Sequence, residues 1–379
     1  MVNRSTEYLR KAPVLGAIMA PDANSFGVLR FIMASLVLIS HSYMFAFGTP
    51  LAEPLTAWTG HSLGQHAVQG FFILSGILVA QSFERSRSLF DFTAARVLRI
   101  FPGLIVCVLL TAFVLGPIVS ELSAHAYFTS AALPIYLVKT LSLATGSAPL
   151  PGVFNELPMP GIVNSSLWTL KFEVLCYAGL AFAGLAGLFN AKYRYVTAAL
   201  LAAFLASVYA IDPQPFTQHS FTDNMRYFAL YFGTGTLIYL LRDKLVISGF
   251  ALIPLAVVFI AALGTRFAEP ATAALLGYAI VWAANQTFGP LRAVCNRIDL
   301  SFGVYIYAGP IQQALIGAAP ALPPMAVSMV AFAVVLPLAL LSWILVEHPA
   351  LRFRGELRSI ISRRMLRHAA PAAFQQPLR

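Results

Sequence analysis

Residues 26–47 read FGVLRFIMASLVLISHSYMFAF, and within these residues the only basic side chains are those of Arg30 and His41. An α-helix rises 1.5 Å per residue, so about 20 apolar residues cross the ~30 Å hydrocarbon core of a bilayer. The whole chain shares this character, because 59% of its 379 residues are hydrophobic, 11% are charged, and its mean hydropathy is +0.76. A soluble domain carries about 25% charged residues. The composition therefore excludes a water-soluble enzyme, a disordered protein and a nucleic-acid-binding protein.

Further runs similar to residues 26–47 predict an all-α integral membrane protein with about ten transmembrane helices. The expected spans are residues 26–47, 66–83, 97–120, 166–189, 195–211, 224–241, 248–264, 270–286, 298–316 and 324–346. An eleventh run, at residues 127–143, contains Pro134 and Lys139. We expect this run in a long external loop, as a helix that lies in the membrane interface.

The positive charges predict the orientation of these spans. Of the 25 Lys and Arg residues, 20 fall at the chain ends and in alternate connections, two fall in the other connections, and three lie within the runs. Cytoplasmic connections carry the excess of Lys and Arg, so both termini are expected in the cytoplasm. The chain then divides into a cytoplasmic N-terminal segment (residues 1–23), a membrane domain (24–350) and a basic cytoplasmic tail (351–379). The net charge of +10 follows from this topology and indicates no nucleic-acid partner.

Arg30 and His41 are eleven residues apart in the first run. Eleven steps of ~100° return to within ~20° of the same helix face, and they separate the two side chains by ~16 Å of depth. Ionisable groups inside a membrane are costly, so a shared stripe of this kind indicates a function. The alternative is structural: Arg30 reaches the cytoplasmic surface, and His41 bonds to a neighbouring backbone carbonyl.

Arg96 and Arg99 lie at the start of the third run, three residues apart and so on one helix face. Helix N-termini favour anions and arginine matches phosphate geometry, which together predict a phosphate-bearing cytosolic ligand. The alternative is that both arginines only anchor the inner end of the helix. Glu347, at the cytoplasmic end of the last run, is placed to pair with internal arginines.

Glu173 lies seven residues into the fourth run, which is expected to run from outside to inside. It is then ~10 Å below the outer face, and His41 is at a similar depth of ~8 Å. A carboxylate beside an imidazole can orient it or handle a second proton, which favours general-base chemistry. The alternative is that Glu173 pairs with Lys171 or Arg226 and only neutralises charge.

The ninth run is partly polar, because it contains Tyr305, Tyr307, Gln312 and Gln313, and this composition suits a cavity wall. The three cysteines have no metal-ligand or paired spacing. The chain also contains no HExxH motif. We therefore expect no metal and no tightly bound cofactor.

Six short motifs, in this order, resemble the acyltransferase-3 family of multi-span membrane acyltransferases. The resemblance covers residues ~24–350. The motifs are Arg30-x10-His41, FFILSG at residues 71–76, Arg96-x-x-Arg99 before IFP at 100–102, SLWTLKFE at 166–173, SFGVYIY at 301–307 and EHP at 347–349.

The resemblance implies a multi-pass enzyme of the cytoplasmic (inner) membrane. Such an enzyme passes an acyl group, usually acetyl, from cytosolic acyl-coenzyme A to a hydroxyl of an extracytoplasmic carbohydrate or glycolipid. Its partners would be these two substrates and the lipid bilayer. By this resemblance His41 is the catalytic base, and the depth of Glu173 makes it the expected second catalytic residue. The matched arginines Arg30, Arg96 and Arg99 are expected to bind the donor, and the matched aromatic residues Trp168, Tyr305 and Tyr307 to contact substrate.

Two positions depart from the family pattern. Gly27 stands where an acidic residue often precedes the first-span arginine, and Ala308 and Gly309 stand where many members have a histidine. These departures leave the subgroup and the acceptor open. The acyl chain length, the oligomeric state and the choice between direct transfer and an acyl-histidine intermediate also stay open.

A transporter or flippase of lipid-linked saccharides is the alternative function. It would equally explain ten spans and buried charge. Transporters often show internal repeats and interrupted helices in matching halves of the chain, and the sequence shows no repeat of fixed period. The enzyme is therefore the favoured interpretation.

Overall fold

The computed structural model describes residues 13–20, 23–146, 148–211, 220–353 and 355. Within these ranges the regular structure is helical, and β-pairing is confined to two isolated bridges, Val14 with Val246 and Ser120 with Val153. The expected all-α fold is thus confirmed. Most of the predicted N-terminal segment and cytoplasmic tail lies outside the described residues.

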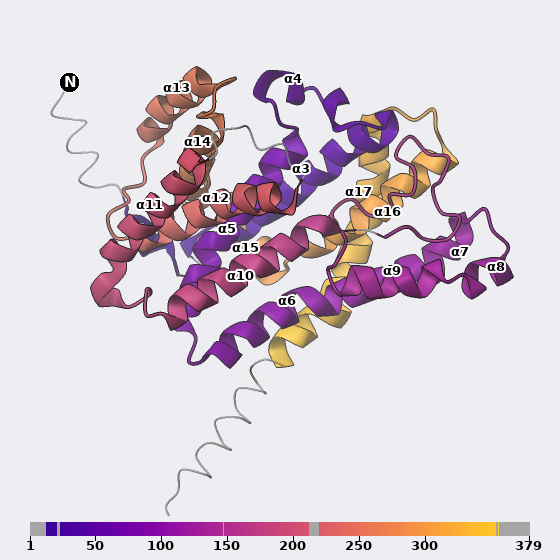
Figure 1. The fold of residues 1–379 in the computed structure, drawn as a ribbon, viewed down its shortest axis with the longest axis horizontal. Helices are drawn as coiled ribbons and strands as arrows, with labels where there is room; N and C mark the ends of the chain where they lie inside the picture. The colour runs from indigo at the N-terminus through magenta and orange to yellow at the C-terminus, as the bar shows by residue number, and fades with distance from the viewer. Residues whose placement is uncertain (1–12, 21–22, 147, 212–219, 354, 356–379) are drawn as a thin grey trace, which may run out of the picture.

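The helices follow the expected apolar runs closely (Figure 1). Those with α labels are α2 (Leu15–Ile18), α3 (Phe26–Phe47), α4 (Thr56–Thr59), α5 (Leu63–Arg85), α6 (Leu89–Leu110), α7 (Gly116–Val119), α8 (Ala124–Thr129), α9 (Ala132–Leu141), α10 (Leu170–Leu185), α11 (Arg194–Ile211), α12 (Phe221–Leu240), α13 (Leu252–Ala262), α14 (Ala268–Ala284), α15 (Pro290–Arg297), α16 (Ser301–Ala318) and α17 (Pro324–Ser342). Short 3-10 turns include η4 (Leu167–Thr169), and two π-helical turns are η3 (Thr111–Leu115) and η7 (Trp343–Glu347).

Five helical stretches among the described residues are long and apolar enough to cross a membrane. They are Phe26–Phe47, Leu63–Arg85, Leu89–Val119, Leu167–Leu185 and Pro324–Phe353. The other expected spans also form helices, but these are shorter or more polar. The protein is therefore a membrane protein, as its composition predicts.

The centre of the molecule is a bundle in which α3, α5, α12 and α16 pack together (Figure 1). Glycines allow the closest approach, between α5 and α12. A Cβ atom on Gly76 would lie 2.1 Å from the backbone oxygen of Phe232, and one on Gly235 would lie 1.9 Å from that of Ile73. Small residues at such crossings let helix backbones pack directly, which stabilises helix pairs in membranes.

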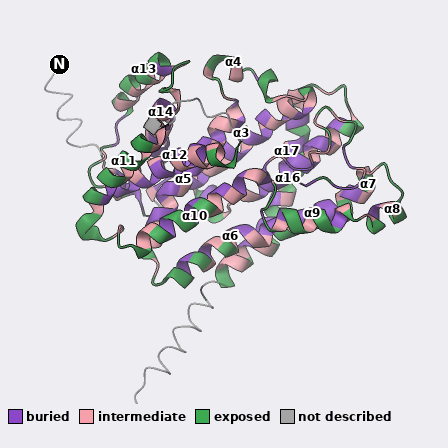
Figure 2. Ribbon diagram, in the orientation of Figure 1, coloured by how far each residue is buried: buried purple, intermediate pink, exposed green. Residues whose placement is uncertain are grey.

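Many residues of the outer helices are exposed (Figure 2), and large apolar residues are among them. Phe182 on α10, Phe204 on α11 and Met329 on α17 are all more than half exposed. Exposed apolar surface on several sides is unusual for a soluble monomer. It is the surface expected where the protein faces lipid.

One helix boundary differs from its prediction in a way that affects the site. The third run was expected to begin near Arg96, but α6 begins at Leu89 and Ser88 caps it by accepting the backbone N–H of Asp91. The prediction that Arg96 and Arg99 lie at a helix N-terminus is therefore wrong. Any attraction of these residues for anions comes from their guanidinium groups.

Candidate active site

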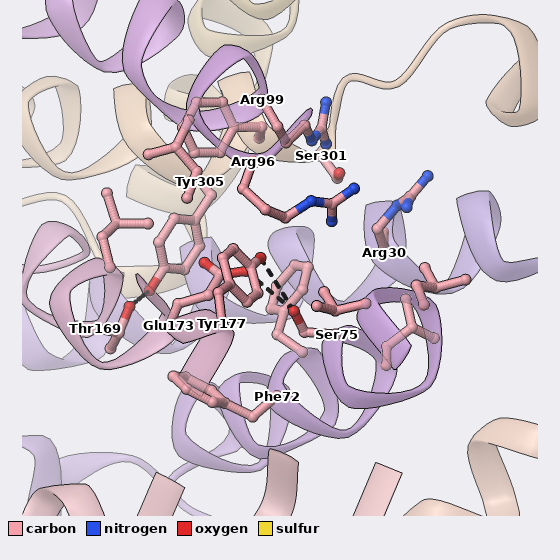
Figure 3. Close-up of a pocket in the computed structure, with 17 residues that line it drawn as sticks. Arg30, Phe72, Ser75, Arg96, Arg99, Thr169, Glu173, Tyr177, Ser301 and Tyr305 are labelled. Atoms are coloured by element: carbon pink, nitrogen blue, oxygen red, sulfur yellow. Dashed lines mark hydrogen bonds between the residues drawn. The ribbon is translucent and has the colours of Figure 1, made fainter. Parts of the chain in front are cut away.

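A cavity of about 120 Å³ lies between α3, α5, α6, α10 and α16 (Figure 3). It brings together five residues that sequence reasoning assigned to the site. They are Arg30, Arg96, Arg99, Glu173 and Tyr305. They come from four helices, because Arg96 and Arg99 share α6, and the three guanidinium groups gather at one end of the cavity (Figure 3).

Asp299 connects two of these arginines. Its Oδ2 atom lies 3.0 Å from Arg30 Nη2 and 2.7 Å from Arg99 Nη2, and its Oδ1 atom accepts the backbone N–H of Ser301. The residue lies in the loop before α16. Its carboxylate therefore holds both guanidinium groups in place.

Sequence reasoning missed Asp299, because it was taken as the end of an apolar run. A signal was nevertheless present. It is a single acidic residue at the inner end of an expected span, on the side where positive charges gather.

Glu347 holds Arg99 from the other side, as its position at the end of the last run predicted. Its Oε2 atom lies 3.8 Å from Arg99 Nη1, and its Oε1 atom accepts a hydrogen bond of 2.8 Å from Ser342 Oγ. The side chain of Glu347 is only 2% exposed. It lies in the π-helical turn η7, and such turns are frequent at functional sites.

Arg96 and Arg30 line the cavity beside Arg99 (Figure 3). Arg96 Nη2 lies 3.4 Å from Ser82 Oγ, and its guanidinium lies over the ring of Tyr177. The Nε atom of Arg30 is buried and has no hydrogen-bond partner in the described structure. A buried donor without a partner is costly, so this end of the cavity is suited to an anionic ligand.

Glu173 lies on the wall of the same cavity and not beside His41. Ser75 Oγ donates to its Oε1 atom over 3.2 Å, and the hydroxyl of Tyr177 donates to the same oxygen (Figure 3). The expected pairing of Glu173 with His41 is not formed. Equal depth did not bring the two groups together, because depth does not determine the direction in which a helix presents a side chain.

The structural alternative for Glu173 is not formed either. Lys171 lies over the rings of Phe172 and Phe221, and Arg226 has Asp223 3.8 Å away. Two residues along a helix correspond to a turn of ~200°. Lys171 therefore points away from the carboxylate that it was expected to neutralise.

On the side of the cavity away from the guanidinium groups, the hydroxyls of Thr169 and Tyr305 form a hydrogen bond of 2.7 Å (Figure 3). The other expected substrate contacts, Trp168 and Tyr307, lie outside the lining. Trp168 packs on Phe172 and Phe228, and Tyr307 is buried two residues beyond Tyr305 on α16. Of these three aromatic residues, the structure places only Tyr305 on the cavity.

The glutamines expected in the cavity wall serve another purpose. Gln312 donates to the backbone oxygen of Leu38 and to Ser42 Oγ, which ties α16 to α3. Gln313 donates to the backbone oxygens of Met159 and Ile162. These bonds hold the outer part of the fold together.

His41 lies outside the lining of the cavity. Its Nδ1 atom is 3.2 Å from Ser165 Oγ, and its ring packs on Phe45 with 5.7 Å between ring centroids. Its hydrogen-bond partner in the described structure is thus a hydroxyl, and the alternative of a backbone carbonyl is wrong. An imidazole beside a hydroxyl is an arrangement that can remove a proton from that hydroxyl.

A polar stripe connects the two ends of the site. It consists of four residues at intervals of four: Ser165 in the turn before η4, Thr169 at the end of η4, and Glu173 and Tyr177 on α10. Ser165 meets His41 at one end, and Tyr177 lies beneath Arg96 at the other. The site therefore has a cationic end and a basic end, which the stripe joins through a membrane domain.

Comparisons with known proteins agree with this arrangement. The sequence profile of the acyltransferase-3 family, described as an acyltransferase domain, matches residues 24–346. An O-acetyl transferase of Shigella phage Sf6 is 33% identical over 338 residues, which cover 86% of this chain and 95% of the relative. Nodulation protein 10 of Rhizobium leguminosarum bv. viciae is 27% identical over 373 residues, which cover 90% of this chain and 96% of that protein. No solved structure matches the chain.

The family profile spans most of the chain and includes every residue that lines the cavity, as well as His41. This membership favours an enzyme over the alternative of a transporter or flippase. The chain belongs to the acyltransferase-3 family, and it is a membrane acyltransferase.

Proposed function

We propose that this protein moves an acetyl group from cytosolic acetyl-coenzyme A to a hydroxyl of an extracytoplasmic carbohydrate or glycolipid. The observation that carries the proposal is the separation of two chemistries along one helix. Arg30 belongs to the arginine cluster and His41 to the basic end, and eleven residues of α3 span ~16 Å between them. A donor held at one face of the membrane can thereby react near the other.

The proposed topology has ten membrane spans with both termini in the cytoplasm, in the cytoplasmic (inner) membrane. The distribution of Lys and Arg supports it, because 20 of the 25 then face the cytoplasm. It also assigns the arginine cluster to the cytoplasmic side, where acetyl-coenzyme A is available. The helix α9 then lies in the external loop.

The arginine cluster suits the phosphates of coenzyme A. A guanidinium has five N–H donors, and Arg30 uses one of them on Asp299. The Nε atom of Arg30 is buried without a partner, so donors are available for phosphate oxygens. Charge-assisted hydrogen bonds from arginine to phosphate are among the strongest in proteins.

His41 supplies the base that the reaction needs. In direct transfer, the imidazole accepts the proton of the acceptor hydroxyl while the oxygen attacks the thioester carbonyl. The coenzyme A thiolate leaves and takes up a proton. Imidazole suits this role because its ordinary pKa lies close to neutral pH.

The nature of the acyl group and of the acceptor rests on similarity. The relative from phage Sf6 is named an O-acetyl transferase, which supports acetyl as the group and a hydroxyl as the acceptor. The carbohydrate follows from the family resemblance. The particular glycan stays open.

The test compares the surface glycan of the host with and without the gene by NMR. We expect an O-acetyl signal that disappears with the gene, returns with the wild-type gene, and does not return with His41→Ala. The purified wild-type protein and the purified His41→Ala protein should both bind acetyl-coenzyme A in lipid nanodiscs. Normal glycan acetylation by a correctly inserted His41→Ala protein would overturn the assignment of the base, and an unchanged glycan without the gene would overturn the acceptor class.

A further inference from the structure

The hydroxyl that faces His41 in this structure belongs to the protein itself. Ser165 Oγ lies 3.2 Å from Nδ1 and 3.5 Å from Nε2 of the imidazole. These are its hydrogen bonds among the described residues, so no other side chain competes for the hydroxyl. A serine hydroxyl within reach of a histidine is the geometry of an activated nucleophile.

The position of Ser165 relative to the cavity supports a chemical role. Ser165 precedes Thr169 by four residues, in the turn that leads into η4, and Thr169 lines the cavity. Ser165 and His41 are both partly exposed, whereas the neighbouring Ser166 is 1% exposed. Ser165 is therefore less buried than its neighbour and stands close in sequence to a residue of the cavity wall.

Ser165 also lies just before the helix formed by η4 and α10. The first N–H groups of a helix have no partner within it, and they favour negative charge nearby. An oxyanion that forms at an acyl group on Ser165 would lie near these donors. The same region thus combines a nucleophile, a base and an environment that favours negative charge.

We propose that Ser165 is a catalytic nucleophile, which carries the acyl group from acetyl-coenzyme A to the acceptor as an acyl-serine. This inference rests on the proposed function, since it requires the same donor and acceptor. It differs in mechanism, because it divides the reaction into two transfers. His41 acts as the base in both.

The two steps balance in atoms and charge. In the first step, His41 accepts the proton of Ser165 while Oγ bonds to the thioester carbonyl carbon. The carbon–sulfur bond then breaks, and the coenzyme A thiolate takes the proton from the imidazolium. In the second step, His41 accepts the proton of the acceptor hydroxyl, whose oxygen displaces Ser165 Oγ from the acyl carbon. The imidazolium returns its proton to Oγ, which restores the enzyme.

The structure gives a reason to prefer this two-step reaction to direct transfer. In direct transfer, the acceptor hydroxyl would have to displace Ser165 Oγ from the imidazole before the thioester is attacked, whereas in the relay Ser165 Oγ is already in place for that first attack. In the relay, the same imidazole serves Ser165 first and the acceptor afterwards. The donor and the acceptor then need not be bound at the same time.

An exchange reaction tests the relay without any acceptor. Purified full-length protein in nanodiscs is incubated with unlabelled acetyl-coenzyme A and radiolabelled coenzyme A. An enzyme that forms an acyl-serine returns the acetyl group to labelled coenzyme A, so the label appears in acetyl-coenzyme A. We expect exchange with the wild type, loss of exchange with Ser165→Ala, and retention with Ser165→Cys, whose thiol also accepts an acyl group.

Ser166→Ala is the matched control, because the Ser166 hydroxyl is buried and has no hydrogen-bond partner in the described structure. It should retain exchange. Peptide mass spectrometry of the wild type should find the acetyl group on Ser165, and addition of an acceptor extract should remove it.

Two results would overturn the relay. The first is a wild-type protein that acetylates the host glycan but catalyses no exchange, which leaves the proposed function intact. The second is an acetyl group found on His41 while Ser165→Ala still exchanges. A wild-type protein that neither binds acetyl-coenzyme A nor changes the glycan would instead refute the proposed function, and the relay with it.

Discussion

Replacement of Arg99 by glutamine tests whether this residue binds the donor or only neutralises buried acids. Arg99 lies 2.7 Å from Asp299 and 3.8 Å from Glu347, measured between the closest charged atoms. The substitution Arg99→Gln removes the positive charge from both contacts. It should therefore affect the stability of the fold as well as the binding of acetyl-coenzyme A.

The cost in stability follows from the geometry. At an effective dielectric constant of about 20, unit charges 3.8 Å apart attract by ~4 kcal/mol. Removing one partner of a buried pair costs about 3–5 kcal/mol, because the other charge is left uncompensated. The Arg99 side chain is 22% exposed and Arg30 still faces Asp299, so we expect a loss near the lower end, about 3 kcal/mol. That corresponds to a fall in Tm of roughly 5 °C.

A second substitution separates the two roles. Glu347→Gln in the Arg99→Gln protein removes the acid that was left without its partner, so most of the lost Tm should return. Donor binding should not return, since the guanidinium is still absent. A charged hydrogen bond contributes about 1.5–3 kcal/mol, which corresponds to a rise in Kd of roughly 10- to 100-fold. Glu347→Gln alone is the control, and it should leave the Kd close to that of the wild type.

The assay measures the Tm and the Kd for coenzyme A of all four proteins in nanodiscs. We expect Tm to fall in Arg99→Gln and recover in the double variant, with a raised Kd in both. Recovery of the Kd together with the Tm would refute the reasoning, because it would show that Arg99 acts only through the fold. An unchanged Kd in Arg99→Gln would refute it as well.

Three further predictions concern other parts of the molecule. Glu173→Gln should lower transfer by less than His41→Ala does, because Glu173 bonds to Ser75 and Tyr177 and not to the imidazole; equal loss in kcat would contradict this. Gly76→Ala should destabilise the protein by about 1–3 kcal/mol, since a Cβ atom there meets a backbone oxygen at 2.1 Å, whereas Gly179→Ala, with no atom within 4 Å, should leave Tm nearly unchanged. Reporter fusions at Lys192 should read as cytoplasmic and fusions near residue 146 as external, and the reverse would exclude the proposed topology.

The sequence predicted the helices well, because the property that forms them is local. Apolar runs of about 20 residues must satisfy their backbone hydrogen bonds internally in a membrane, and a helix does this. Helix ends were less predictable. The segment at residues 89–96 continues α6 toward its N-terminus although it contains Asp91, since Ser88 and Asp91 form a capping contact that hydropathy does not detect.

The sequence predicted many of the residues that form the site, but it did not predict which residues they contact. Charged residues inside apolar runs are conspicuous, and the structure brings Arg30, Arg96 and Arg99 to one cavity. Their partners depend on the rotation of each helix about its axis, which the sequence does not give. The prediction used depth alone and therefore paired Glu173 with His41. In the structure, Ser165 lies beside the imidazole of His41.

The hydrogen bond between Thr169 and Tyr305 bears on how protons and the acyl group would move through the site. In the proposed mechanism, the acyl group passes from the arginine cluster to Ser165 and His41. An enzyme that works across an energised membrane must pass an acyl group without letting protons follow. The mechanism therefore requires the two hydroxyls to part for the acyl group and to pair again afterwards, so that a path for water would form only while a donor is bound.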